Sequence, residues 1–222
     1  MKKLSLLPVA AALLLAGSAA AQNALIDYQG YAWETGGIPA SAAGDVLSFV
    51  GVVDNIDARF GINFGTEEVT LHVTGLSSGG QVNLGGGLLS VAYSGGTIGL
   101  YRDPSRNHDY GTFPANATAP STFVDGSLLL GGTLSNFVLF IDTTTGSGAY
   151  ESSASFTSGS GLATLNLLQA NGYTFGGVLN SAASGGNNPA GYDLQVDGTI
   201  EVEVIVGVQE KTWGAMKNLY RR

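Results

Sequence analysis

Hydrophobic and polar residues alternate with a period of two over many short runs of this chain. In "EVTLHVTG", Val69, Leu71 and Val73 alternate with Thr70 and other polar residues. The run "GTIEVEVIVGV" alternates apolar residues with two glutamates in the same way. Successive side chains of a strand point to opposite faces, so this period indicates strands with one buried and one wet face.

Runs rich in β-branched and aromatic residues, bounded by Gly, Asn, Asp and Ser, predict the strands. The candidates are Leu25–Trp33, Val46–Val53, Glu68–Thr74, Leu88–Tyr93, Thr97–Arg102, Ser127–Leu130, Asn136–Asp142, Ser153–Thr157, Leu162–Leu168, Tyr173–Leu179 and Tyr192–Val208. Runs at this density are typical of one all-β domain over residues 22–207, a β-sandwich or jelly roll. Two small β domains joined at Thr112–Thr122 are the alternative.

Three segments indicate how the strands are connected. The sequence Ser94-Gly95-Gly96 lies between two strand-like runs and predicts a hairpin. The pair Asp197-Gly198 predicts either a second turn or a bulge in one long strand. The segment "GLATLNLLQANG" from Gly161 is ambiguous between a strand and a helical turn.

The N-terminal 21 residues have the three parts of a secretory signal peptide. Lys2 and Lys3 form a basic start, Leu4 to Leu15 is apolar, and Ala19-Ala20-Ala21 precedes a predicted cut before Gln22. The apolar run is shorter than the roughly 20 residues that span a bilayer. We therefore expect an exported chain with no transmembrane anchor in its mature form.

Composition narrows the class of partner. The 222 residues include 34 glycines and no cysteine, so disulfides cannot stabilise the fold. Residues 22–207 hold three arginines, no lysine and sixteen acids, a net charge of −13. Such a surface repels phosphates and excludes a nucleic-acid partner, whereas it can attract Ca²⁺.

One loop offers oxygen ligands for a cation. In "YRDPSRNHDYGTF", Asp103, Asn107 and Asp109 are spaced so that they could wrap a hard cation such as Ca²⁺. Asp and Asn are also common turn formers, because their side chains bond nearby backbone N–H groups. No other cofactor is expected.

Aromatic residues suggest a binding surface for sugars. Tyr31 and Trp33 share one face of a predicted strand, and Tyr101 flanks the acidic loop. If these rings are exposed, they could stack on a polysaccharide. If they are buried, they belong to the hydrophobic core.

Signals for catalysis are weak, and we expect no enzymatic activity. Gly75 to Gly79 matches G-x-S-x-G, but no helix that would present the serine is predicted after it. A P-loop would need a lysine that residues 22–207 lack. A glycosidase pair such as Glu67 with Glu151 is the remaining hydrolase alternative.

The last residues, 208–222, predict a short amphipathic helix. Trp213, Met216 and Tyr220 fall on one side, whereas Lys217 and Arg221 fall on the other. So short a helix is marginal alone and needs a partner. It could be an address or anchor, a segment docked on the acidic domain, or a segment lying on anionic lipid.

The leader, the cysteine-free Gly/Ser/Ala-rich domain and the closing strand "GYDLQVDGTIEVEV" resemble bacterial surface proteins of the PEP-CTERM type. The Pro-Glu-Pro box of that family is absent. The end "TWGAMKNLYR" is instead similar to endings of uncharacterised secreted bacterial proteins. The resemblance implies a secreted bacterial protein that is extracellular, at the cell surface or in the periplasm. We therefore expect a structural or adhesive role at the surface or in the matrix, with sorting or cell-envelope machinery as partner of the tail. A carbohydrate- or Ca²⁺-binding module is the second hypothesis.

Overall fold

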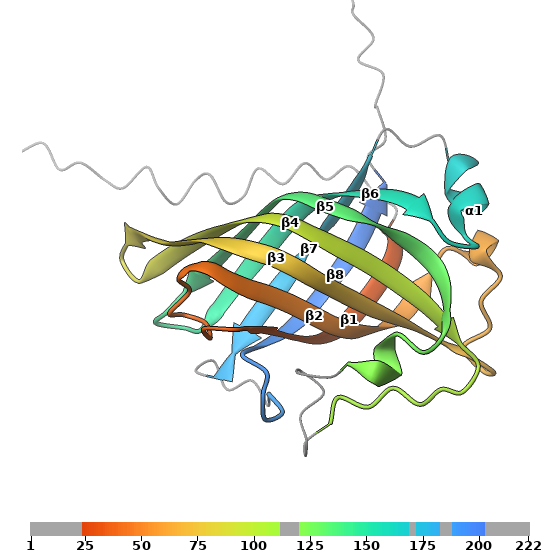
Figure 1. Ribbon diagram of the computed structural model, residues 1–222, viewed down its shortest axis with the longest axis horizontal. Coiled ribbons are helices and arrows are strands. Elements are labelled where there is room, and N and C mark those ends of the chain that lie inside the picture. Colours follow the sequence, from red (N-terminus) through yellow and green to blue (C-terminus); the bar gives the residue numbers. More distant parts are fainter. Residues whose placement is uncertain (1–23, 112–119, 169–171, 183–187, 203–222) are drawn as a thin grey trace, which may run out of the picture.

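The computed structural model describes residues 24–111, 120–168, 172–182 and 188–202. The predicted leader (1–21) and the tail residues Trp213, Met216, Lys217, Tyr220 and Arg221 lie outside the described residues. The described chain is all-β, as predicted, but the β-sandwich or jelly-roll prediction is wrong. The strands form one closed antiparallel barrel in the order in which they occur in the sequence (Figure 1).

The barrel has eight strands. Its strands are β1 (Ala24–Glu34), β2 (Ala43–Ile56), β3 (Glu68–Gly85), β4 (Leu88–Asp103), β5 (Ser127–Asp142), β6 (Ser147–Ser158), β7 (Tyr173–Ser181) and β8 (Leu194–Val202). The described helices are η2 (Ala58–Phe60), η4 (Ser121–Phe123) and α1 (Leu162–Asn166). Within these described ranges, no helix has the length and apolar character needed to cross a membrane.

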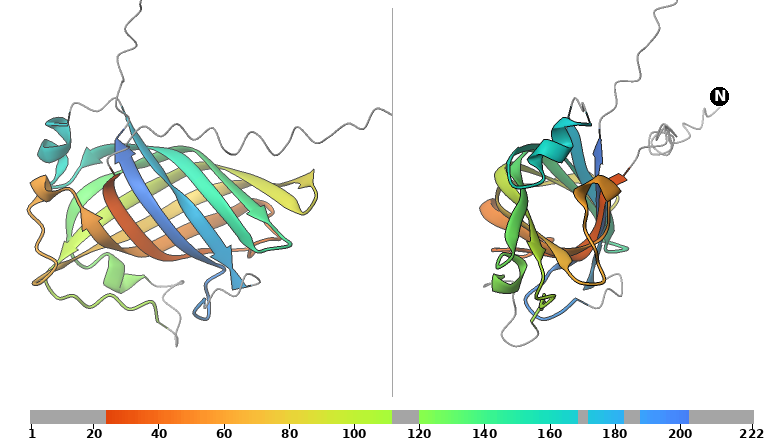
Figure 2. Two further views of the ribbon diagram at one scale, coloured as in Figure 1. Left: turned by 180° about the vertical axis from the view of Figure 1, so that it is seen from behind. Right: turned by 90° about the vertical axis from the view of Figure 1, so that its right-hand side faces the viewer.

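Pairing of the first and last strands closes the barrel. Tyr28 of β1 lies opposite Gly198 of β8, and Ile26 lies opposite Ile200. Figure 2 shows the resulting ring of strands in the view along the barrel. A sandwich and a barrel need the same alternation of side chains, but closure leaves neither β1 nor β8 as an exposed edge strand.

Aromatic side chains fill much of the barrel interior. The rings of Tyr28 and Phe175 stack at 5.3 Å, and those of Phe137 and Tyr150 stack at 5.9 Å. Phe49 contacts three of these rings from β2. The hydroxyls of Tyr28 and Tyr150 lie 2.7 Å apart, and burial raises the pKa of both. The interior is therefore a packed core.

Two glycines make room for this pair of hydroxyls. A Cβ atom at Gly198 would lie 2.6 Å from Tyr28 Oη and 2.5 Å from Tyr150 Oη. A Cβ atom at Gly177 would lie 2.7 Å from Tyr150 Oη. Glycine on β7 and β8 thus lets two large rings meet across the interior.

The structure settles the three predicted connections. β4 continues through Ser94-Gly95-Gly96, so the predicted hairpin is wrong. Gly95 and Gly96 have φ values of 71° and 101°, which bend the strand without reversing it. β8 also continues through Asp197-Gly198 without a shift of register, so the strand is uninterrupted there and contains neither the predicted turn nor the predicted bulge. The ambiguous segment contains α1, so its helical interpretation is confirmed.

The outer surface has two contrasting walls. The connection from β4 to β5, described over residues 104–111 and 120–126, lies against the outer face of β1–β3, and we call it the strap (Figure 1). We call this face the strapped wall. The outer face of β5–β7 is the bare wall, on which Glu151, Ser153 and Ser155 of β6 are exposed.

Candidate functional site

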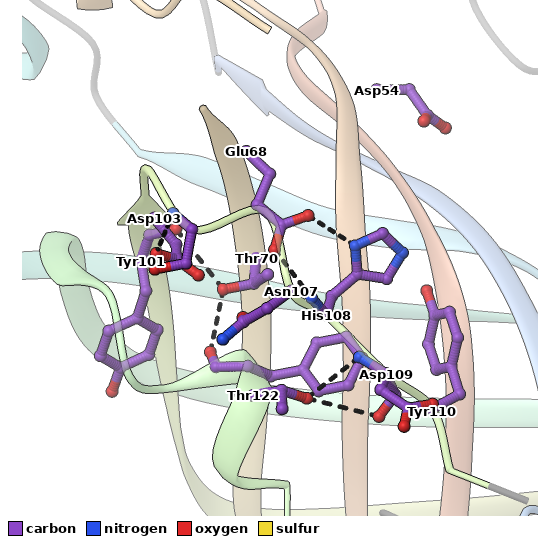
Figure 3. Close-up of polar contacts among 12 residues, drawn as sticks. Asp54, Glu68, Thr70, Tyr101, Asp103, Asn107, His108, Asp109, Tyr110 and Thr122 are labelled. Atoms are coloured by element: carbon purple, nitrogen blue, oxygen red, sulfur yellow. Dashed lines mark hydrogen bonds and ion pairs between the residues drawn. The ribbon is translucent and has the colours of Figure 1, made fainter. Parts of the chain in front are cut away.

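A carboxylate at the start of β3 clamps the strap to the barrel. The backbone N–H of His108 donates to Glu68 Oε1 at 2.9 Å, and His108 Nδ1 lies 2.5 Å from Glu68 Oε2 (Figure 3). The Glu68 side chain is 8% exposed. Two contacts to one shielded carboxylate fix both the backbone and the ring of His108.

A second contact holds the two halves of the strap together. The backbone N–H of Asp109 donates to Thr122 Oγ1 at 3.1 Å (Figure 3). Behind this contact, Thr70 Oγ1 on β3 donates to the carbonyl of Phe123 at 3.0 Å. Thr70 was expected on a wet face, but it is buried because the strap covers it.

An aromatic cluster joins the strap to the strapped wall. The rings of Tyr31 and Tyr110 meet edge to face at 4.8 Å, and those of Tyr110 and Phe123 lie 5.0 Å apart. Tyr192, from the connection before β8, donates through its hydroxyl to the carbonyl of Tyr110 at 3.0 Å. Burial raises the pKa of Tyr110 and of Tyr192, so both hydroxyls stay protonated and able to donate.

A groove of about 290 Å³ lies along the edge of this cluster. Its lining comes from β1, β2, β8 and the strap: Gln29, Gly30, Tyr31, Val52, Asp54, His108, Tyr110 and Gln195. The strand register explains why these residues lie together, because Gln29 pairs with Val52 on β2 and Tyr31 pairs with Gln195 on β8. Alternate residues of β1 therefore present an amide and then a ring to the same groove.

The groove combines aromatic rings with hydrogen-bonding groups. Tyr31 and Tyr110 are half-buried, whereas Gln29, Asp54, His108 and Gln195 are exposed. Gln29 Nε2 donates to Asp54 Oδ1 at 3.3 Å, which orients the amide beside the carboxylate. Small-molecule sites have this make-up of apolar rings and a few convergent polar groups.

The three rings predicted to bind sugar lie in different surroundings. Tyr31 lines the groove. Trp33 packs edge to face on Tyr192 at 5.6 Å and belongs to the aromatic cluster. Tyr101 lies on β4, and its ring points away from His108 in Figure 3. The structure therefore brings one of the three to the groove.

The residues predicted to bind Ca²⁺ make contacts of ordinary turns. Asp103 Oδ1 accepts from the N–H of Ser105, and Asp109 Oδ1 accepts from the N–H of Gly111, each at 2.8 Å. Asn107 Nδ2 donates to Asp125 at 3.1 Å. Over the described ranges, no group of three or more His, Cys, Asp or Glu side chains could hold a metal ion.

The weak enzymatic candidates occupy separate elements. Arg102 binds Glu67 through two side-chain contacts and lowers its pKa, whereas Glu151 is exposed on β6. The G-x-S-x-G segment lies within β3, which continues to Gly85. Its serine therefore lies on a strand and lacks the strand-to-helix turn that a nucleophile elbow requires.

A buried polar cluster lies at the end of the barrel opposite to α1. Ser41 Oγ donates to Glu34 Oε1 at 2.7 Å and lies 2.7 Å from Ser78 Oγ. Glu34 is 5% exposed, and burial raises its pKa. These groups bond one another, which indicates a structural role in closing this end.

Sequence reasoning missed most of the groove. Gln29, Asp54 and Gln195 lie on strands far apart in the chain, and no local motif links them. His108 attracted attention as a loop residue, but its partner Glu68 lies forty positions earlier. The even spacing of Gln29 and Tyr31 was the one usable signal, since it places both on one strand face.

The fold is thus a closed, filled barrel with a groove on its outer wall. Comparisons of the chain with protein families, with curated proteins and with solved structures give no match.

Proposed function

We propose that this protein is an exported, non-enzymatic binding module that holds a neutral carbohydrate in the groove beside the strap. The observation that carries the proposal is the meeting of Tyr31 and Tyr110 with the exposed polar groups of Gln29, Asp54 and Gln195. An aromatic ring can cover the apolar face of a sugar, while amide and carboxylate oxygens bind its hydroxyls.

The size and charge of the groove narrow the ligand class. Its volume of about 290 Å³ suits a single sugar ring of a longer chain. The strongly acidic composition of residues 22–207 disfavours polyanionic glycans, because like charges repel. Neutral polysaccharides are therefore the preferred ligands. This role suits the structural or adhesive function at the bacterial surface or in the matrix that we expect from the resemblance to bacterial surface proteins.

A pull-down on neutral polysaccharides tests the proposal. The probes are insoluble cellulose, xylan and starch, with the full chain and its variants in solution. The double variant Gln29→Ala, Gln195→Ala should bind at least about fivefold more weakly, since each lost hydrogen bond removes roughly 0.5–1.5 kcal/mol. Both side chains are exposed, so the fold should persist, as far-ultraviolet circular dichroism can check.

The matched control is Glu151→Ala on the bare wall, which should bind as the parent does. Retention of the parent on none of the three polysaccharides would reject the proposed ligand class. Equal binding by the parent and the double variant would reject the groove as the site.

A further inference from the structure

A row of outward-facing residues begins near the β3–β4 turn and continues over the bare wall, so that it crosses five strands, β3 to β7. Register places Val82 opposite Ser90, Ser90 opposite Phe140, Phe140 opposite Ala149 and Ala149 opposite Val178. Val82 is 57% exposed, Phe140 43% and Val178 56%. Directly opposed side chains lie about 5 Å apart, so this row is a continuous, mainly apolar strip.

A groove of about 430 Å³ adjoins this strip along β6, β7 and β8. Ala149 belongs to both, while Glu151 and Glu201 supply carboxylates to the groove. Gly176 lies between Glu151 and Thr199 in the register and has no side chain to fill the space. An apolar strip next to an acidic hollow suits a partner with aromatic and cationic side chains.

Cations on the described barrel are engaged elsewhere. Arg59 pairs with Asp57, Arg102 pairs with Glu67, and Arg106 donates to the carbonyl of Gly65. In the part of the chain that the structure describes, these three arginines are the only Lys or Arg residues. None of these three arginines pairs with Glu151 on the bare wall or with Glu201 on the neighbouring β8, so both carboxylates are open to a cationic partner from outside the described barrel.

We propose that the C-terminal segment Thr212–Arg222 of the same chain docks on the bare wall. Trp213, Met216 and Tyr220 cover the strip of Phe140, Ala149 and Val178. Lys217, Arg221 and Arg222 lie beside Glu151 and Glu201. The segment holds three of the nine cations of the chain, so opposite charges favour the contact.

The connecting chain is long enough for this contact. β8 ends at Val202, which pairs with Tyr173 at the start of β7. Val178 lies five positions farther along β7, or about 17 Å at the rise of a strand. Residues 203–211 can extend to roughly 30 Å, so Trp213 reaches the strip without strain.

Disulfide trapping tests the docking, because the chain has no cysteine of its own. The test variant of the full chain carries Val178→Cys and Met216→Cys, and the control carries Asn55→Cys and Met216→Cys. Asn55 is exposed and lies on β2 across β1 from Thr199, so it is also within reach of the tail. Docking raises the effective concentration of one cysteine near the other. The test pair should therefore form its intramolecular disulfide at least about tenfold faster than the control pair.

Charge reversal is the second measurement. Glu151→Lys with Glu201→Lys should lower the rate of the test pair to that of the control pair. Adding Lys217→Glu and Arg221→Glu should restore it. Both acids lie on the barrel surface, and circular dichroism checks that the strands remain.

Equal oxidation rates for the two pairs would overturn the proposal and indicate a segment free of the barrel. Disulfide-linked dimers as the main product would overturn it in favour of a second copy as the occupant. The experiment needs no carbohydrate, so its outcome is independent of the groove beside the strap.

Discussion

The two walls of this barrel share a strand pattern but differ in what covers them. Val50 on the strapped wall is 0% exposed, because Phe123 and Tyr192 pack over it. Val178 points outward from the bare wall in the same way and is 56% exposed. Alternation along a strand thus decides which face a side chain takes, while distant connections decide whether that face meets water.

This difference indicates two kinds of surface. On the strapped wall, the extra layer fixes Tyr31 and Tyr110 beside polar groups, which gives a preformed groove. On the bare wall, no described part of the chain covers the apolar strip, which adjoins carboxylates. A groove whose side chains are already ordered favours small ligands, because its side chains lose little conformational entropy on binding. An exposed apolar strip instead suits a chain segment that becomes ordered as it binds.

The largest contrast should come from truncating one phenylalanine on each wall. Phe123 of the strap is 0% exposed against the strapped wall, so Phe123→Ala should cost about 3–5 kcal/mol in the free energy of unfolding. Phe140 is 43% exposed, and Phe140→Ala should cost less than about 1 kcal/mol. Urea denaturation measures both. Similar losses would mean that the strap does not bury its wall in solution.

A smaller contrast should follow from neutralising one glutamate on each wall. Glu68→Gln weakens the two contacts to His108 and should cost about 1–3 kcal/mol, because the carboxylate is shielded. Glu151→Gln on the exposed face of β6 should change stability by less than about 0.5 kcal/mol. Hydrogen exchange at the His108 amide should quicken only in the first variant. Unchanged exchange there would show that Glu68 is not the clamp.

The smallest effect should be a dependence of stability on pH through His72. Burial on the strapped side lowers the pKa of His72, so the unfolded chain binds its proton more readily than the folded chain. This contribution to stability is complete above the ordinary histidine pKa of about 6.5 and is lost as the pH falls through that value.

Unfolding free energies measured at about pH 7.5 and 5.5 should therefore differ less in His72→Gln than in the parent. Because His108 remains in both proteins, the comparison isolates His72. An identical pH dependence in the two proteins would contradict the effect of burial.

Much of the fold followed from local pattern. Val69, Leu71 and Val73 were expected on one buried face, and each is at most 1% exposed. Their neighbour Thr70 was expected to be wet but is 1% exposed, since its cover comes from Phe123. Ser94–Gly96 was read as a hairpin because glycine marks both turns and bends, and only pairing with β3 and β5 distinguishes them.

The candidate site was less predictable than the strands. Tyr31 was identified because it shares a strand face with Trp33, but Gln29, Asp54 and Gln195 carry no signal of their own. Polar residues of this kind are common on any strand surface. They become a site only where β1 lies between β2 and β8, which no short stretch of sequence records.

By itself, the sequence determined the β class, the inward-facing residues and the segregation of cations toward the ends of the chain, because these depend on neighbouring residues alone. The tertiary structure decided closure into a barrel, the course of the strap and the contrast between the walls. Those features depend on contacts such as Ile26 with Ile200 and Glu68 with His108. Such contacts join residues far apart in the sequence, and their free energy appears only when the whole sheet has formed.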